Sequence, residues 1–127
     1  MEKIFEYKVV IVTGGASGIG KAAAVAFARL GAKVVVADWQ DGAETVELVK
    51  KAGSEGIFVK CDVSKDADVK AMVEKTIKTY GRLDFGINNA GIEGVQTPLQ
   101  NLLESDWDKT INVNLKGIWL CMKYEIP

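Results

Sequence analysis

The sequence predicts an α/β fold with a doubly wound parallel sheet, in which helices cover both faces. Short β-branched runs alternate with longer helical stretches four times along the chain, and parallel strands need such crossover helices. A glycine-rich turn joins the first β-branched run to the first helical stretch. The 127 residues match the length of one domain, and no repeat or low-complexity segment divides them. We therefore expect one domain over residues 1–127, with strand order 3-2-1-4.

The first half of the chain predicts two strands and two helices. Residues 9–12 (Val-Val-Ile-Val) form a buried strand that leads into the glycine-rich turn. Residues 19–30 are Ala-rich and helical, and Gly31 stands where a C-terminal capping glycine belongs. Residues 33–38 form a second buried strand, and apolar residues at every third position in 43–49 indicate a weaker second helix.

The second half predicts two more strands and two more helices. Residues 57–59 form a third strand, and Ser64 is expected to cap the following helix. Residues 83–87 form a fourth strand, and Ser105 with Asp108 resembles a capping box at the start of a last helix. The third helix is predicted from apolar spacing of three and four, at Val69, Met72, Val73, Thr76, Ile77 and Tyr80.

Composition excludes several classes of function. Apolar residues make up 48% of the chain and charged residues 26%, which disfavours disorder. The formal net charge of −1 leaves no basic surface for nucleic acid. The chain has no His, so a Ser-His-Asp triad and His-containing metal sites are excluded, and we expect no metal.

The cysteines and apolar runs predict a cellular location. Cys61 and Cys121 are isolated and form no CxxC pair, so we expect two small buried side chains in a reducing compartment. The apolar run at residues 9–12 is too short for a signal peptide, and no run could span a bilayer. We expect a cytoplasmic protein that does not bind membranes.

The glycine-rich turn indicates a phosphate-binding loop. Residues 13–20 read Thr-Gly-Gly-Ala-Ser-Gly-Ile-Gly, which is GxxxGxG between a strand and a helix. Glycines let the backbone turn sharply and let a phosphate approach closely. The N-terminus of the helix adds unpaired N–H groups and the positive end of a dipole. This setting predicts a dinucleotide diphosphate at the loop.

Two alternatives compete at this loop. Gly15 to Lys21 fits the GxxxxGK part of a P-loop, but Ala22 stands where a magnesium-binding Ser or Thr belongs. Because that hydroxyl is missing, Lys21 is more simply interpreted as a solvated helix residue. A tight turn without any ligand is the other alternative, although three glycines exceed what a turn needs.

The end of the second strand indicates which nucleotide is bound. Asp38 follows a buried run and lies eighteen residues after Gly20, where a carboxylate accepts hydrogen bonds from an adenosine ribose. Its charge, and a loop that offers Ser17 but no Lys or Arg, favour NAD over NADP. Trp39 could flank the adenine. A solvated carboxylate at Asp38 and an ordinary surface aromatic at Trp39 are the alternatives.

These motifs together resemble the classical short-chain dehydrogenase/reductase family. The family's order and spacing are matched by Thr13-Gly14-xxx-Gly18-x-Gly20, Asp62-Val63, Asn88-Asn89-Ala90-Gly91 and Asn112-Val113-Asn114. The resemblance covers nearly the whole chain, and the glycine motif combined with Asn-Asn-Ala-Gly is specific. It implies a Rossmann-type fold and reversible hydride transfer between NAD and a secondary alcohol or ketone.

The resemblance also implies positions for NAD. The loop would surround the diphosphate and the adenosine ribose, and Asp62, a buried carboxylate, would accept from the adenine amino group beside the Val63 backbone. Residues 89–91 would close the fourth strand and line the cofactor, although Asn89 could equally tie neighbouring strands together. The predicted cofactor-binding residues are Gly14, Ser17, Gly18, Ile19, Gly20, Asp38, Trp39, Asp62, Val63, Asn89, Ala90, Gly91 and Val113.

Of the family's catalytic set, the sequence contains only Asn114. In the family this residue lies in a helix and helps hold a water that relays protons to the catalytic lysine; an exposed polar helix face is the alternative. The family's Tyr-xxx-Lys pair is absent, because none of the three tyrosines is followed by Lys four residues later. We therefore expect the N-terminal, cofactor-binding half of an enzyme, truncated after the fourth βα unit and inactive alone.

The last helix, towards Pro127, is apolar nearly all round and would need burial on two sides. One face carries Ile111, Leu115, Ile118, Met122 and Ile126, and other faces carry Trp119, Leu120 and Tyr124. In the family this helix packs on the sheet and across a dimer interface, so we expect a homo-oligomer. Two other functions remain open: a non-catalytic NAD-binding or interaction module, and a P-loop nucleotide hydrolase.

Overall fold

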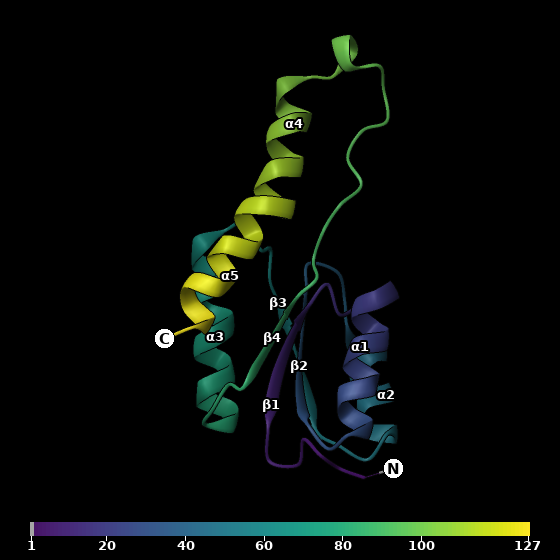
Figure 1. Ribbon diagram of the computed structural model, residues 1–127, viewed down its shortest axis with the longest axis vertical. Coiled ribbons are helices and arrows are strands. Elements are labelled where there is room, and N and C mark those ends of the chain that lie inside the picture. The colour runs from purple at the N-terminus through teal and green to yellow at the C-terminus, as the bar shows by residue number, and fades with distance from the viewer. Residues whose placement is uncertain (1) are drawn as a thin grey trace.

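The computed structural model describes residues 2–127 and contains a four-stranded parallel sheet with helices on both faces (Figure 1). The strand order is β3-β2-β1-β4, which confirms the predicted doubly wound sheet. Met1, where the predicted domain begins, lies outside the described residues. The regular elements are β1 (Val9–Thr13), α1 (Gly18–Arg29), β2 (Lys33–Asp38), α2 (Ala43–Lys51), β3 (Gly56–Lys60), α3 (Asp66–Tyr80), β4 (Phe85–Asn88), η1 (Leu99–Asn101), α4 (Glu104–Ile111), η2 (Asn112–Lys116) and α5 (Gly117–Glu125).

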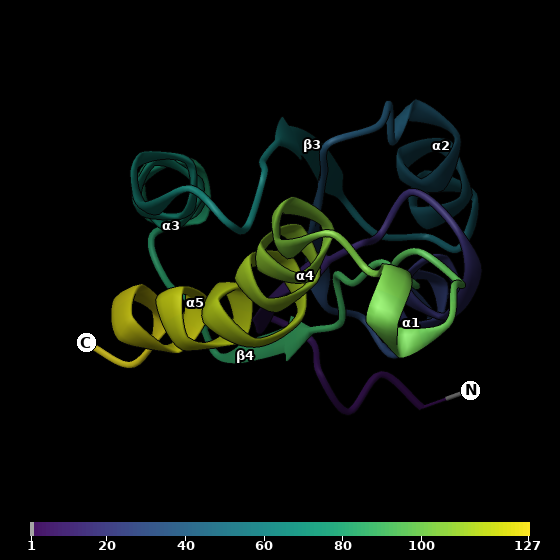
Figure 2. The same cartoon turned by 90° about the horizontal axis from the view of Figure 1, so that it is seen from above.

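Alternate residues of the central strands supply two separate cores. Val10 and Val12 of β1 point to one face, where they pack with Ala24 and Ala28 of α1. Ile11 points to the other face, where its core includes buried residues of α3, among them Met72, and of α5, among them Leu120. Figure 2 shows α1 and α2 on one side of the sheet and α3 and α5 on the other. Because both faces are covered, β1 is buried along its whole length, as its β-branched sequence predicts.

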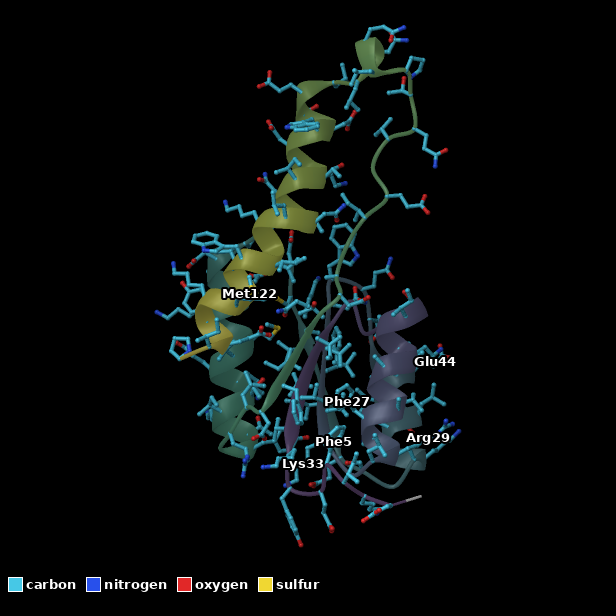
Figure 3. The ribbon with its side chains drawn as sticks, in the orientation of Figure 1. Phe5, Phe27, Arg29, Lys33, Glu44 and Met122 are labelled. Carbon is cyan, nitrogen blue, oxygen red and sulfur yellow. The ribbon has the colours of Figure 1, made fainter. Side chains whose placement is uncertain are left out.

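The strands end together at one edge of the sheet. The parallel register places Thr13 of β1 opposite Ala37 of β2 and Asn88 of β4. At the other end, the rings of Phe5, Phe27 and Phe85 pack with centroids 5.0–5.8 Å apart. Figure 3 labels Phe5 and Phe27 there. The aromatic cluster therefore fills the amino end of the core. A ligand site is expected at the carboxyl end of the sheet instead.

The predicted last helix is continuous but irregular. It begins at Glu104, so Ser105 lies inside its first turn and the predicted capping box is wrong. The segment η2 is a π-helical turn between α4 and α5, and α4 extends beyond the carboxyl end of the sheet (Figure 1). On α5, Leu120 and Cys121 are buried, whereas the predicted apolar face is largely exposed; that face includes Leu115, Ile118, Met122 and Ile126.

Two other predicted boundaries are corrected by side-chain hydrogen bonds. Ser64 does not cap α3, which begins at Asp66, because its hydroxyl donates to Asp62 Oδ1 at 2.6 Å. Strand β4 begins two residues later than predicted. Asp84 precedes it and uses its side chain, since the Val9 N–H donates to Asp84 Oδ2 at 2.8 Å. Over residues 2–127, no helix is both long and apolar enough to cross a membrane.

Candidate functional site

A cavity of about 570 Å³ lies at the carboxyl ends of the strands. It brings together twelve of the fourteen residues that the sequence singled out; Gly20 and Asn114 are the two that do not line it. The structure adds four residues to the lining: Gln40, Cys61, Ile92 and Glu93. The predicted residues in the lining are Gly14, Ser17, Gly18, Ile19, Asp38, Trp39, Asp62, Val63, Asn89, Ala90, Gly91 and Val113.

The glycine-rich loop borders the cavity in a conformation that needs glycine. Gly18 begins α1 at φ +55°, in the left-handed region, and a Cβ built there would meet nothing within 4 Å, so the cavity side of the loop is open. Gly20 is closed in instead, because a Cβ there would collide with the Gly14 carbonyl oxygen and lie 2.7 Å from Asn89 Nδ2. Gly20 therefore supports the loop from behind.

Asp38 is a buried, hydrogen-bonded carboxylate and not a solvated one. Only 8% of the residue is exposed. Its Oδ2 accepts the Ala16 N–H at 3.0 Å, and its Oδ1 accepts the Gln40 N–H at 3.0 Å. The carboxylate thus joins the end of β2 to the glycine-rich loop, and each oxygen keeps a lone pair for a further donor. The solvated alternative for Asp38 is wrong.

Thr13 and Asn89 tie the ends of β1 and β4 together. The Thr13 hydroxyl accepts the N–H groups of Asn89 and Ala90 at 3.0 and 3.1 Å. The Asn89 amide donates to the Thr13 carbonyl at 3.2 Å. The strand-tying alternative for Asn89 is what the structure shows, while Asn89 also lines the cavity. The sequence included Thr13 in its motif without a role, and its side chain proves to be the centre of this junction.

Asp62 lines the cavity and is half-buried, not buried as expected. Its Oδ1 accepts both the N–H and the hydroxyl of Ser64, at 3.0 and 2.6 Å. The Asp62 N–H donates to Asp68 Oδ2 at 2.9 Å. These bonds fix the turn after β3, so that the carboxylate stays at the cavity wall next to Val63.

Asn114 connects the last helix to the segment after β4. Its Oδ1 accepts the Ile92 N–H and its Nδ2 donates to the Ile92 carbonyl, both at 2.8 Å. Both ends of the amide are therefore used, and the exposed-face alternative is wrong. Asn114 lies within the π-helical turn η2, and it positions Ile92, which does line the cavity.

Lys21 does not point to the loop. Its Nζ lies 2.7 Å from Glu44 Oε1, so it forms an ion pair with α2 and is not simply solvated. Glu44 lies on the α1–α2 side of the molecule (Figure 3). A P-loop lysine must instead reach the phosphates of its nucleotide. Trp39, which lines the cavity, is exposed, and Lys109 Nζ lies 5.9 Å from its ring centre.

Both cysteines are buried, free thiols, as the sequence predicted. Burial, together with the smaller effect of the Asp68 and Asp62 charges, raises the pKa of Cys61 to about 12. Burial likewise raises the pKa of Cys121 to about 12. Neither thiol is therefore a nucleophile at neutral pH. In the described part of the chain, no three His, Cys, Asp or Glu side chains form a group that could hold a metal ion.

Comparison with known proteins places this arrangement in a family. The short chain dehydrogenase family matches residues 8–127. The chain belongs to this family. An uncharacterized oxidoreductase of Thermotoga maritima is 49% identical over 96% of this chain and 48% of its own length. A 3beta-hydroxysteroid dehydrogenase of Mediterraneibacter gnavus is 40% identical over 96% of this chain and 45% of its own.

Solved structures of two reductases share the fold. Levodione reductase has a TM-score of 0.92 and 36% identity, over 96% of this chain and 49% of its own. The NADH-dependent reductase A1-R′, solved with NAD, has a TM-score of 0.92 and 28% identity, over all of this chain and 54% of its own. The chain thus spans about half the length of the relatives that it matches.

Proposed function

We propose that this chain is the NAD-binding half of a short-chain dehydrogenase, which transfers hydride between NAD and a secondary alcohol or ketone. The observation that supports this most strongly is the cavity at the carboxyl ends of the strands. There the N-terminus of α1, Asp38 and Asp62 face one space, in the position where open α/β sheets bind nucleotides. A bound NAD would supply or accept the hydride.

The residues present fit such a cofactor. The first-turn N–H groups of α1 have no preceding helical carbonyl to pair with, and the open cavity side of Gly18 leaves room for a phosphate. Asp38 has lone pairs for ribose hydroxyls, and its charge would repel a 2′-phosphate. Asp62 would accept from the adenine amino group. Asn89, Ala90 and Gly91 would line the cofactor.

The remaining residues suggest how this half contributes to an enzyme. Asn114 would act as a positioning residue, because it fastens the last helix to Ile92 at the cavity wall. The proton chemistry of the family needs a Tyr-xxx-Lys pair, which these 127 residues do not contain. The chain would therefore bind the cofactor but catalyse no turnover on its own. We place it in the cytoplasm.

The exposed apolar face of the last helix supports a homo-oligomer. Leu115, Ile118 and Met122 are all exposed, and Met122 lies on α5, on the opposite side of the sheet from α1 (Figure 3). Large exposed apolar patches of this kind are typical of protein interfaces. In sedimentation equilibrium, we expect Met122→Lys to shift the chain towards monomer. An unchanged distribution would contradict this interface.

Calorimetric titration of the chain tests cofactor binding. We expect saturable binding of NADH, much weaker binding of NADPH, and no binding of ATP with magnesium. Equal affinity for NADPH would contradict the role of Asp38. Magnesium-dependent ATP binding would favour a nucleotide hydrolase instead, although the ion pair of Lys21 with Glu44 argues against it.

A further inference from the structure

One peptide unit of the glycine-rich loop is held at both of its polar ends. The Gly15 carbonyl accepts the hydroxyl of Thr45 at 2.7 Å, and the Ala16 N–H donates to Asp38 at 3.0 Å. Thr45 is fully buried and comes from the third residue of α2, whereas Asp38 ends β2. Two elements that follow the loop in sequence therefore fix the direction of its Gly15–Ala16 peptide.

The surroundings leave this peptide little freedom. The Gly15 N–H donates to the Ala37 carbonyl at 3.2 Å, so the loop is also bonded to β2. A Cβ at Gly15 would lie 2.9 Å from Val36 Cγ1, which shows how closely the loop packs on the sheet. In addition to the bond between Thr45 and Gly15, the ion pair between Lys21 and Glu44 joins the first turn of α1 to the first turn of α2. Thr45 is the buried member of this attachment of α2 to the loop.

We propose that Thr45 is a positioning residue for the diphosphate of the dinucleotide, which it serves through the Gly15–Ala16 peptide without touching the ligand. This inference rests on the proposed function. Both polar ends of the peptide bond to the protein, so this unit is a support and not a phosphate ligand. Its direction sets where the following N–H groups, from Ser17 to Gly20, point. Thr45 and Asp38 thus link the diphosphate loop to the ribose carboxylate.

The expected effect follows from preorganisation. Without the Thr45 hydroxyl, the buried Gly15 carbonyl loses its partner, and an unpaired buried carbonyl favours loop conformations in which the peptide turns towards water. Apparent affinity falls in proportion to the fraction of molecules with a competent loop. If that fraction falls to about one tenth, the Kd for a diphosphate ligand rises about tenfold.

The test compares three variants by calorimetry. Thr45→Val removes the hydroxyl at nearly constant shape, and Thr45→Ser retains it. Thr76→Val is the matched control, because Thr76 is also fully buried and its hydroxyl donates to a backbone carbonyl, that of Met72, at 2.9 Å. We expect Thr45→Val to bind NADH and ADP-ribose about tenfold more weakly than the wild type. Its affinity for adenosine, which has no phosphate, should be unchanged. Thr45→Ser and Thr76→Val are expected to bind all three ligands as the wild type does.

The other possible results would each contradict the inference, the proposed function, or both. Unchanged NADH binding by Thr45→Val overturns the inference alone, and so does an equal loss for adenosine. Absence of NADH binding by the wild type overturns the proposed function and this inference together. If Thr45→Val does not fold, Thr45→Ala is titrated in its place. Faster amide exchange at Ala16 in the hydroxyl-free variant is expected, and unchanged exchange would show that Thr45 does not hold the peptide.

Discussion

Removal of the Asp38 charge is expected to weaken NADH binding without creating NADPH binding. A carboxylate at the end of β2 would repel a 2′-phosphate, so charge alone predicts that Asp38→Asn accepts NADPH. The structure predicts otherwise, because the two carboxylate oxygens serve two different backbone N–H groups, those of Ala16 and Gln40. An amide has only one acceptor oxygen, so it can keep only one of these bonds.

The size of the effect follows from these bonds. A hydrogen bond to a charged group contributes about 1.5–3 kcal/mol. Asp38 is almost fully buried, so little solvent is available to replace a lost acceptor. Asp38→Asn is therefore expected to lower the free energy of unfolding by about 2 kcal/mol, and Asp38→Ala by about 4 kcal/mol. Because the Ala16 N–H loses its acceptor, Asp38→Asn is expected to bind NADH at least tenfold more weakly than the wild type. Its affinity for NADPH is not expected to rise.

Urea unfolding and calorimetric titration measure both effects. Asp41→Asn is the matched control, because it removes the same charge from an exposed position whose single bond, from the Ala43 N–H at 3.0 Å, an amide oxygen can keep. Its unfolding free energy is expected to stay within about 0.5 kcal/mol of the wild type. An Asp38→Asn protein of unchanged stability that binds NADPH as tightly as NADH would refute the reasoning.

Three further predictions concern packing and the thiols. Gly86→Ala is expected to lower the unfolding free energy by only about 1 kcal/mol, because its Cβ would lie 2.7 Å from the Glu125 carboxyl carbon and the end of that flexible side chain must move; adding Glu125→Ala should remove most of this loss. Asn114→Leu is expected to cost about 2 kcal/mol through the loss of two backbone hydrogen bonds. Cys61 and Cys121 are expected to resist a thiol reagent near neutral pH until the chain is unfolded, because burial raises both pKa values to about 12.

Each of these predictions has a contradicting result. If Gly86→Ala costs the same with and without Glu125, the loss does not come from their contact. For Asn114→Leu the control is Asn112→Leu, an exposed position in the same π-helical turn, and equal urea midpoints for the two variants would contradict the Ile92 bonds. Rapid labelling of either cysteine in the folded chain would contradict its burial.

The sheet and most of the cavity lining could be predicted because their signals are local. Short β-branched runs identify buried parallel strands, and residues directly after such strands must meet at one edge. The glycines, Asp38 and residues 89–91 follow strand ends, so their common location required no knowledge of packing. Of the lining residues that the structure adds, Ile92 and Glu93 lie in a loop that carries no local pattern.

The residues that support the site from behind could not be predicted in the same way. Thr45 looks like any polar residue of a weak helix, and its bond to Gly15 spans thirty positions. Asn114 was singled out by its motif, but its bonds to Ile92 depend on a π-helical turn that apolar spacing does not indicate. In both cases the partner is a backbone group of a distant segment.

The predicted helix starts show how a nearby acceptor or an earlier start defeats a capping rule. Ser64 has the residue type and the position of an N-cap, but the Asp62 carboxylate lies two residues away and takes its hydroxyl. Ser105 fits a capping box, but α4 already begins at Glu104. Side-chain choice among competing partners is a tertiary property, and a sequence pattern does not contain it.

Mapping of backbone amide chemical shifts during titration with NAD tests the central claim most directly, because it shows where the dinucleotide binds. The account predicts the largest changes at residues 17–20, 62–63 and 89–91, around the cavity at the carboxyl ends of the strands. It predicts none at the opposite end of the sheet, around Phe5 and Phe27. Saturable changes confined to that opposite end, or no changes at residues 17–20, would contradict the account.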